Sequence, residues 1–548
     1  MHTRVTNLII VFAVLFIGIS SKAFYEQIIN GPKYAQMSLS SRIIDFPGEE
    51  YVRGDILDCH NVSLTDTRTE TNIVVFPQLI KEHDVLLKKI KKEIPEIYPK
   101  FTNLKPYYRN HIKIYPDPFT IKTNEEDIID TISAWDEKGI MTLPVKTRYG
   151  EYSTATNIVG CLGYKDKGTY REGLLGIEQK WEKKLRGEKA EEIISPIMDG
   201  RGNLLEGLGF RNIMIEKDKK RVDVVLTIDS QIQRVAEEAL DKYNVIKGSV
   251  VVLNIENGDI LAAASRPALD QKKPNFTDQK ERVIDYKVYP GSVFKVLTAA
   301  AILEEGLVTP DSTFDCTGES SLSHVTCPRE HGHLTMTEAM ARSCNTTFVH
   351  YGLQLGPNKL KEYIIDKFGI KPVKGKALNS NNARANGIIG QEIFKTSPLE
   401  IANIMATIAR NGSHQDIEDV WNKRLIKGLI TSEGYENLSK KPIFTKIYSD
   451  TTARELKNML AETNKNGSGK RAWIEEYGSA GKTGTPQTDK ADEYLAWYAG
   501  YAPLENPKWA IAVLIEEKES KSKEELQGGR DAGPIFKHII DTILKFEK

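Results

Sequence analysis

Three short segments of the sequence carry the residue types of a serine nucleophile and its supporting groups. In chain order they are Ser292-Val293-Phe294-Lys295, Ser343-Cys344-Asn345 and Lys482-Thr483-Gly484-Thr485, which read S-x-x-K, S-x-N and K-T-G. A serine hydroxyl is a poor nucleophile until a base takes its proton. The three segments together therefore predict an acyl-transfer enzyme that works through a covalent serine intermediate.

The first segment is predicted to begin a buried helix at Ser292. A chain-reversing Pro290-Gly291 pair precedes it, residues 293–303 are almost entirely apolar, and Gly306 suits a C-cap. Positions i and i+3 share a helix face, so Lys295 lies one turn from the serine. Because burial among apolar neighbours disfavours the ammonium form, Lys295 is predicted to act as the base.

The third segment is predicted to be a strand that another backbone approaches closely. Small residues flank Lys482 on both sides, and two β-like runs follow it. Strand alternation places Lys482 and Gly484 on one face and Thr483 and Thr485 on the other. The expected roles are cationic stabilisation by Lys482 and carboxylate binding by the two threonines. The N–H groups of Ser292 and Thr485 are expected to form an oxyanion hole.

Residues from about 225 to the C-terminus resemble the transpeptidase domain of class B penicillin-binding proteins, of the sporulation/division type found in spore-forming Gram-positive bacteria. Apart from the three segments, the shared sequences are Leu226-Thr227-Ile228-Asp229, Gly258-Asp259-Ile260-Leu261, Gly390-Gln391, Ser397-Pro398-Leu399 and Ala496-Trp497-Tyr498-Ala499-Gly500. The resemblance implies an α/β fold of the α+β type, in which helices flank a central antiparallel sheet beside an all-helical lobe.

The resemblance also implies a reaction. Ser292 is expected to attack the penultimate D-Ala carbonyl of a peptidoglycan stem peptide, and β-lactams are expected to acylate the same serine. By analogy, Ser343 relays protons and Asn345 holds the substrate amide. The implied chemistry requires no cofactor.

Two other readings of the same motifs stay open. The first is a D,D-carboxypeptidase or β-lactamase, in which water removes the acyl group, although no sequence segment identifies a deacylating base. The second is a penicillin-binding scaffold or sensor. A sensor would need several membrane spans or a cytoplasmic domain, whereas the sequence has one apolar N-terminal stretch.

The length of 548 residues suggests two or three domains. Residues 1–24 are predicted to be a cytoplasmic stub and a transmembrane anchor, because an apolar run follows Arg4. A cleaved export signal is the alternative. Either reading places the catalytic part outside the cytoplasm, and the resemblance favours a single-pass protein of the cell membrane.

Residues 25–222 are predicted to form an N-terminal pedestal (dimerisation-type) domain, and residues 223–548 the penicillin-binding transpeptidase domain. Arg53-Gly54-Asp55-Ile56 resembles the start of the family's pedestal, but Cys59-His60-Asn61 departs from the family pattern there. Residues 65–145 resemble nothing further, and their composition predicts helices with short linkers.

The 75 basic and 75 acidic residues cancel, so no global field indicates a nucleic-acid partner. The resemblance implies other partners instead. They are peptidoglycan stem peptides, β-lactams, the membrane, and a wall glycosyltransferase together with other wall-synthesis proteins.

A cysteine cluster surrounds the second motif. Cys316, Cys327, His333 and Cys344 form a Cys3His set, which is typical of a closed structural zinc site. Some class B enzymes from spore-forming bacteria look similar here. A Cys316–Cys327 disulfide is a second interpretation, since export permits one. Unpaired thiols with a loop histidine are the third.

Overall fold

The protein is described here from a computed structural model, in which two compact units are distinguished. The first comprises residues 1–52, 68–147 and 188–218, and the second residues 53–67, 148–187 and 219–548. The residues outside the description are 1, 31–52, 102–103, 110–111, 115, 117–118, 122, 124, 136, 138, 165–170, 188–191, 197–209, 215–217, 440, 491, 520–521, 523–524 and 547–548. Parts of the predicted pedestal segment 25–222 therefore lie outside it.

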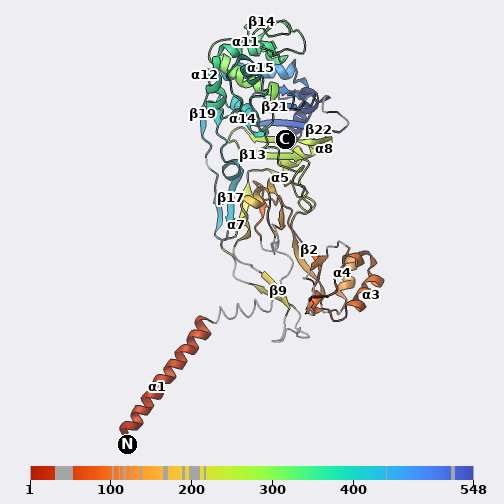
Figure 1. The fold of residues 1–548 in the computed structure, drawn as a ribbon, viewed down its shortest axis with the longest axis vertical. Coiled ribbons are helices and arrows are strands. Elements are labelled where there is room, and N and C mark those ends of the chain that lie inside the picture. The colour runs from red at the N-terminus through yellow and green to blue at the C-terminus, as the bar shows by residue number, and fades with distance from the viewer. Residues whose placement is uncertain are drawn as a thin grey trace. The chain divides into compact units, whose positions relative to one another are not determined.

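The centre of the second unit is a five-stranded antiparallel sheet (Figure 1). Its strand order is β13-β12-β22-β21-β20, so the strand that carries the K-T-G motif lies at one edge. The strands are β12 (Val245–Asn254), β13 (Ile260–Arg266), β20 (Ala480–Gly484), β21 (Ala496–Ala502) and β22 (Trp509–Lys518). An edge strand leaves one row of backbone groups free for another chain.

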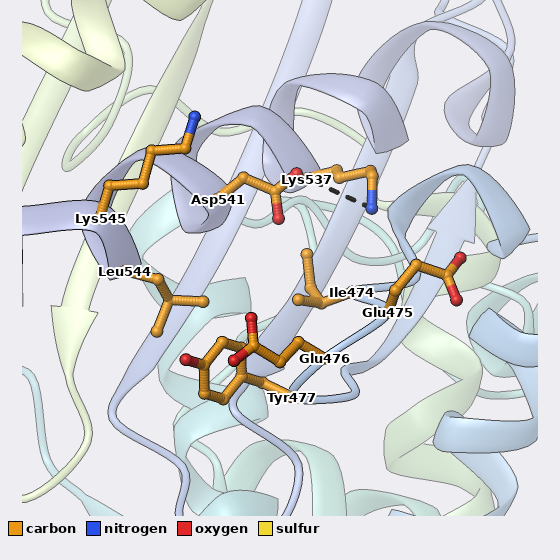
Figure 2. A pocket seen from close by; sticks show the side chains of 8 residues that line it. All are labelled: Ile474, Glu475, Glu476, Tyr477, Lys537, Asp541, Leu544 and Lys545. Atoms are coloured by element: carbon orange, nitrogen blue, oxygen red, sulfur yellow. Dashed lines mark ion pairs between the residues drawn. The ribbon is translucent and has the colours of Figure 1, made fainter. Parts of the chain in front are cut away.

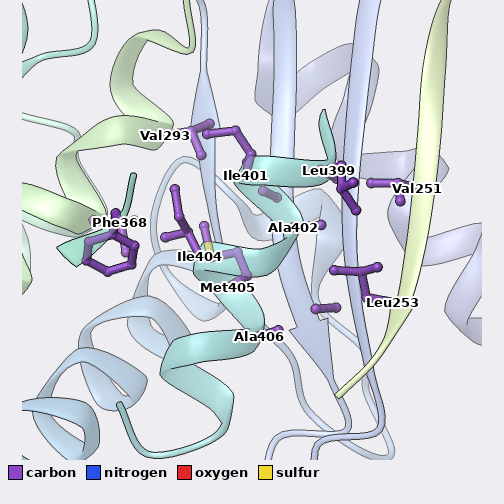
Figure 3. Close-up of a cluster of buried hydrophobic side chains, with 14 of the residues drawn as sticks. Val251, Leu253, Val293, Phe368, Leu399, Ile401, Ala402, Ile404, Met405 and Ala406 are labelled. Atoms are coloured by element: carbon purple, nitrogen blue, oxygen red, sulfur yellow. The ribbon is translucent and has the colours of Figure 1, made fainter. Parts of the chain in front are cut away.

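Helices cover both faces of this sheet because its central strands are apolar on both sides. Val251 and Leu253 of β12 pack with helix α14 (Pro398–Ala409), as Figure 3 shows. Val250 and Val252 belong to the opposite cluster, with α8 (Ser230–Lys242) and α16 (Gly533–Phe546). This alternation is the period of two expected of a strand buried on both faces.

Helix α14 begins at a strong sequence signal. Ser397 accepts a hydrogen bond from the N–H of Glu400, whose side chain accepts one from the N–H of Ser397, and Pro398 occupies the first helical position. Such a capping box satisfies two N–H groups that the helix start would otherwise leave unpaired. Ile401 and Ile404 of this helix lie in the same cluster as Val293, which follows Ser292 (Figure 3).

A helical lobe lies beside the sheet and carries the other two motifs (Figure 1). Its main helices are α9 (Lys295–Glu304), α10 (Met336–Ala341), α11 (Asn345–Gln354), α12 (Gly356–Lys361), α13 (Asn381–Ile388) and α15 (Asp450–Lys465). With the antiparallel sheet and its covering helices, this lobe confirms the predicted fold class.

A four-stranded sheet of the second unit joins distant parts of the chain. Its order is β1 (Ile56–Leu57), β11 (Asp223–Leu226), β17 (Ile426–Thr431) and β18 (Gly434–Asn437). The Arg53-Gly54 pair before β1 has a packing role. Arg53 donates to the fully buried carboxylate of Glu178 at 2.6 Å, and a Cβ on Gly54 would lie 1.9 Å from the Val222 carbonyl oxygen.

The first unit contains a three-stranded sheet that the sequence did not predict. Strand β2 (Arg68–Val75) pairs with β5 (Phe119–Ile121) and β6 (Ile140–Thr147), and α3 (His83–Glu93) and α4 (Glu126–Ser133) pack with it. The expectation of helices with short linkers over 65–145 was therefore wrong. Ile73 and Val75 of β2 lie in the core of this unit, and their β-branched side chains favour a strand.

Near the N-terminus, α1 (His2–Phe24) is followed by a π-helical turn at Tyr25–Ile29. The window Ile9–Ile28 has a mean hydropathy of 1.8, which is long and apolar enough to cross a membrane. This fits the predicted membrane anchor, although an export signal passes the same test.

Candidate active site

Ser292 lies in a short 3-10 turn, Gly291–Phe294, that leads directly into α9. The sequence predicted a helix from Ser292 onward, and the difference lies in the first turn. Gly291 has a φ of +58°, and a Cβ there would lie 2.8 Å from the ring of Pro486. The close approach of the chain after β20 thus requires glycine and shapes the turn that presents the serine.

Lys295 is the first residue of α9 and is fully buried. Its N–H bonds to the carbonyl oxygen of Ser292, so the two residues occupy one helical turn. Burial lowers the pKa of Lys295 to about 8. Its Nζ donates to the Ser343 carbonyl oxygen at 2.8 Å and to Asn345 Oδ1 at 2.6 Å.

Ser343 occupies the turn between α10 and α11 in a left-handed conformation, with φ +60°. Its N–H bonds to the Met340 carbonyl oxygen, and the N–H of Cys344 bonds to that of Ala339. A non-glycine residue in this region costs about 1–2 kcal/mol, so the surrounding contacts must hold it there. The turn directs the Ser343 hydroxyl toward both buried lysines.

Lys482 brings the third motif to the same point. Its Nζ donates to Ser343 Oγ at 2.9 Å, while Lys295 Nζ lies 3.3 Å from the same oxygen. Burial, and then the charge of Lys295, lower the pKa of Lys482 well below its usual value. Two amines on either side of one hydroxyl form a path along which a proton can pass.

The K-T-G strand meets the nucleophile turn on its other side. A Cβ on Gly484 would lie 2.7 Å from the Pro290 carbonyl oxygen, which explains the glycine and confirms a close backbone approach. Thr483 Oγ1 lies 2.8 Å from Ser468 Oγ, and Thr485 Oγ1 accepts a hydrogen bond from the Gly528 N–H at 3.1 Å. Thr485 itself is exposed.

The structure thus brings eight predicted residues together around Ser343 Oγ and the adjoining segments. Within the described part of the chain, the Ser292 hydroxyl makes no hydrogen bond, so the bond between nucleophile and base is not formed in this state. Such bonds often tighten only when substrate binds. The predicted site residues that meet here are Ser292, Lys295, Ser343, Asn345, Lys482, Thr483, Gly484 and Thr485.

The cysteine cluster lies directly behind the S-x-N turn, and its histidine differs from the predicted one. The Sγ atom of Cys327 is 3.8 Å from that of Cys316 and 3.7 Å from that of Cys344. His331 completes the group, with Nδ1 3.4 Å from Cys316 Sγ. His333, the predicted ligand, instead bonds to Asp315 at 2.7 Å and is exposed.

Strand pairing explains this correction. Strands β14 (Thr313–Cys316) and β15 (Gly332–Thr335) form an antiparallel ribbon in which Asp315 is opposite His333. Cross-strand partners share a face, whereas Cys316 is one residue away and points to the other face. His333 therefore cannot reach Cys316. Gly332, with φ +68°, allows His331 to turn toward the sulfur atoms.

The residues of the cluster fit a zinc ion. With Zn–S bonds of about 2.3 Å, tetrahedral geometry separates the sulfur atoms by roughly 3.8 Å. The observed separations of 3.7 and 3.8 Å match this value and exceed by far the length of a disulfide bond, about 2.05 Å. All three cysteines are free thiols, so the Cys316–Cys327 disulfide is not formed in this structure. The Thr346 hydroxyl, 3.2 Å from Cys316 Sγ, can donate to a thiolate.

Two pockets on the second unit do not include the residues around Ser343 Oγ. One, of about 360 Å³, lies between the 474–477 segment and α16, and Figure 2 shows the eight side chains that line it. Charged groups of both signs, such as Lys537 and Asp541, border it. The other, of about 340 Å³, lies beside the nucleophile turn and is lined by Tyr289, Lys395 and Asp489 among others. Neither is lined by Ser292.

Comparison with protein families agrees with the site. The chain matches the penicillin binding protein transpeptidase domain over residues 248–541 and the penicillin-binding protein dimerisation domain over residues 50–208. A curated relative is Stage V sporulation protein D of Bacillus subtilis, 27% identical over 96% of this chain and 83% of the relative. Another is peptidoglycan D,D-transpeptidase FtsI of Buchnera aphidicola, 25% identical over 100% and 96%.

Solved structures share the fold. Penicillin binding protein 3 of Mycobacterium tuberculosis complexed with aztreonam aligns with a TM-score of 0.61 at 21% identity, over 90% of this chain and 96% of that one. A peptidoglycan synthase complex aligns with a TM-score of 0.67 at 22% identity, over 98% and 97%. The family, the fold and the transpeptidase activity that the sequence predicted are confirmed. The chain belongs to the penicillin-binding protein transpeptidases, as a class B member.

Proposed function

We propose that this protein is a membrane-anchored peptidoglycan D,D-transpeptidase that forms an acyl-enzyme at Ser292. The single observation that carries the proposal is the position of Ser343 Oγ. It lies 2.9 Å from Lys482 Nζ and 3.3 Å from Lys295 Nζ, so three motifs distant in the sequence meet at one hydroxyl. This is the arrangement that proton transfer to and from a serine nucleophile needs.

In the proposed acylation step, neutral Lys295 takes the proton of Ser292 as its Oγ attacks the penultimate D-Ala carbonyl carbon. The new bond is an ester, and the bond that breaks joins this carbonyl to the terminal D-Ala nitrogen. That nitrogen needs a proton to leave. The path from Lys295 through Ser343 Oγ to Lys482 can supply it.

The developing oxyanion is proposed to accept hydrogen bonds from the N–H groups of Ser292 and Thr485. Both belong to the facing segments that meet where Gly484 approaches Pro290. Asn345 is proposed to hold the substrate amide, since its Oδ1 and Nδ2 are fixed by Lys295 and by the Thr326 carbonyl oxygen. Thr483 and Thr485 are proposed to bind the substrate carboxylate. An amine of a neighbouring strand then takes the acyl group.

We also propose a location, domain boundaries and partners for the protein. We place the catalytic domain outside the cytoplasm, anchored by the single apolar helix α1. Domain boundaries at 24/25 and 222/223 are proposed for the anchor, pedestal and transpeptidase parts. The aztreonam-bound structure and the synthase complex support β-lactam binding and wall-synthesis partners, and we propose a glycosyltransferase among those partners.

A structural zinc ion is proposed at the cysteine cluster, held by Cys316, Cys327, His331 and Cys344. When bound, it would cross-link the β14–β15 ribbon to the start of α11. The N–H of Asn345 already bonds to Cys327 Sγ at 3.2 Å, so this cross-link would fix the S-x-N turn. The metal takes no part in the acyl transfer.

The central test uses the full-length protein in detergent with a fluorescent penicillin. Wild-type protein is expected to be labelled, and Ser292→Ala is expected to abolish labelling because the attacking oxygen is removed. Ser520→Ala, which alters the other S-x-x-K sequence of the chain, is the matched control and should label normally. Labelling retained in Ser292→Ala would overturn the assignment of the nucleophile.

A further inference from the structure

A second group of side chains of types that bind metals lies far along the sequence from the three-cysteine cluster. It is formed by Cys59, His60 and Asp229, whose ligand atoms all lie within 4.8 Å of one another. Cys59 Sγ is 3.3 Å from His60 Nδ1, and this nitrogen is 3.8 Å from Asp229 Oδ2. The group arises where the sequence departs from the family pattern, directly after β1. All three residues belong to the same compact unit.

The backbone around the two adjacent ligands is held from several sides. Asp58 Oδ1 accepts hydrogen bonds from the N–H groups of His60 and Val62, both at 2.8 Å. The N–H of Cys59 bonds to the Ile228 carbonyl oxygen, and its own carbonyl oxygen accepts a bond from Lys427 Nζ at 2.9 Å. These contacts fix the turn without using the thiol or the imidazole, which contact each other.

The carboxylates of Asp229 and Asp58 are likewise held by hydrogen bonds from backbone N–H groups. Asp229 is the N-cap of α8, and its Oδ1 accepts the N–H groups of Gln231 and Ile232, which leaves Oδ2 directed at His60. Asp58 Oδ2 accepts the N–H of Ser230 at 3.1 Å and lies 3.9 Å from His60 Nδ1. Across the described residues, no lysine or arginine comes within ion-pair distance of either carboxylate. The local negative charge therefore lacks a direct cationic partner.

We propose that Cys59, His60 and Asp229 bind a divalent transition-metal ion, with Zn²⁺ as the best match. A thiolate, an imidazole nitrogen and a carboxylate oxygen are all ligands that Zn²⁺ accepts. In a tetrahedral site a sulfur and a nitrogen ligand would be roughly 3.5 Å apart, and a nitrogen and an oxygen ligand roughly 3.3 Å, for bonds of about 2.0–2.3 Å. The Cys59 Sγ–His60 Nδ1 distance of 3.3 Å is near the first value, and the His60 Nδ1–Asp229 Oδ2 distance of 3.8 Å would shorten by about 0.5 Å on binding.

The proposed site differs in kind from the three-cysteine cluster. His60 is exposed, and three protein ligands leave a fourth position on the solvent side for a water molecule. On binding, the Cys59 thiol releases its proton to solvent and forms an S–Zn bond. The ion would clip the segment after β1 to the start of α8. The proposed site at Cys59, His60 and Asp229 does not depend on the acyl-transfer mechanism proposed above.

Metal counting on the full-length protein tests the proposal. Chelator-treated protein is reloaded in a Zn²⁺ buffer of fixed free concentration, and bound zinc per chain is measured by elemental mass spectrometry. His60→Ala and Cys59→Ser should each bind one equivalent less than wild type. His333→Ala is the matched control, because it removes another exposed histidine beside a carboxylate and should not change the count. Equal counts in wild type and His60→Ala would overturn the site.

Cobalt substitution separates this site from the three-cysteine cluster. In a His331→Ala background, Co²⁺ at the Cys59 site should give a thiolate-to-cobalt charge-transfer band, and the added Cys59→Ser change should reduce that band by one thiolate's contribution. A band unchanged by Cys59→Ser would refute the proposal, since Cys59 then contributes no ligand. Penicillin labelling of each variant verifies that the catalytic domain remains folded.

Discussion

The catalytic centre and the cysteine cluster lie on opposite sides of the same turn, Ser343-Cys344-Asn345, and they are built differently. Ser292, Lys295 and Lys482 belong to the start of a helix or to a strand, where the neighbours of each residue are fixed by the period of the element. The cysteines and His331 come from a two-stranded ribbon, a loop and a turn.

This difference shows which parts of a site local periodicity can determine. Ser343 contributes its hydroxyl to the catalytic side and the next residue, Cys344, contributes its sulfur to the other. Adjacent residues at a left-handed turn point in different directions, so one turn serves both groups. Loss of the proposed nucleophile or base on the catalytic side should nearly stop the reaction, whereas loss of a cluster residue should only weaken it.

Lys295→Ala should have the largest effect. It removes the proposed base, and general-base catalysis contributes about 10²–10⁴-fold. The second-order rate constant of penicillin acylation should therefore fall by at least about 10²-fold. It is measured by quenching the labelling reaction at set times, at several drug concentrations.

Lys457→Ala is the matched control. Burial lowers the pKa of Lys457 as it does that of Lys295, but Lys457 is only half-buried, lies in α15 and donates to Asn411 Oδ1. It should leave acylation within a few-fold of wild type. If Lys295→Ala acylated at the normal rate while remaining folded, another group would be the base.

The pH dependence of acylation should give the next largest effect. Because the pKa of Lys295 is about 8, most of its amine is protonated at pH 6 and cannot accept the serine proton. The neutral fraction, and with it the acylation rate, should rise about tenfold per pH unit from 6 toward 8 and then level off. A rate independent of pH over this interval would contradict a lysine base.

The residues that meet around Ser343 Oγ could be named from the sequence because their spacing within each element is short. An i,i+3 pair at a helix start and alternation in β20 determine which residues share a face. The 3-10 geometry of the first turn was not predictable, since it depends on Pro486 packing against Gly291. That contact joins residues nearly two hundred positions apart.

Residues held by tertiary register were the ones that sequence reasoning missed. His331 and His333 are chemically identical and two positions apart, and only the pairing of Asp315 with His333 decides which one reaches the sulfur atoms. Ser468 gave no signal at all, because it meets Thr483 through the loop after α15. The sheet in 65–145 was missed for the same reason, since β2 finds its partners far along the chain.

His331→Ala should have a moderate effect on the acylation rate. Comparison with His333→Ala tests whether His331, and not His333, is the proposed zinc ligand. Loss of the zinc ligand should release one equivalent of metal and loosen the turn that carries Asn345. A loss of roughly 1 kcal/mol in transition-state stabilisation corresponds to about fivefold slower acylation. His333→Ala should change neither the metal content nor the rate. The opposite pattern would restore His333 as the ligand.

Ser468→Ala should give the smallest effect on the acylation rate. It tests whether a loop residue that contacts the K-T-G strand contributes to acylation. Ser468 Oγ lies 2.8 Å from Thr483 Oγ1, while its N–H bonds to the Ala341 carbonyl oxygen at the end of α10. The hydroxyl thus links the K-T-G strand to the helix that precedes Ser343. A single hydrogen bond contributes about 0.5–1.5 kcal/mol, and the low end applies because Ser468 is exposed, so acylation should slow by only about twofold.

A double-mutant cycle with Thr483→Val assigns that effect to the bond itself. If the two hydroxyls act together, Ser468→Ala should cost little more once Thr483 has become valine. Strictly additive losses would mean that the two hydroxyls act independently, so that Ser468 does not act through its bond to Thr483. In that case the catalytic side would end at the regular elements, and the contrast with the loop-built cysteine cluster would be sharper than the side-chain contacts suggest.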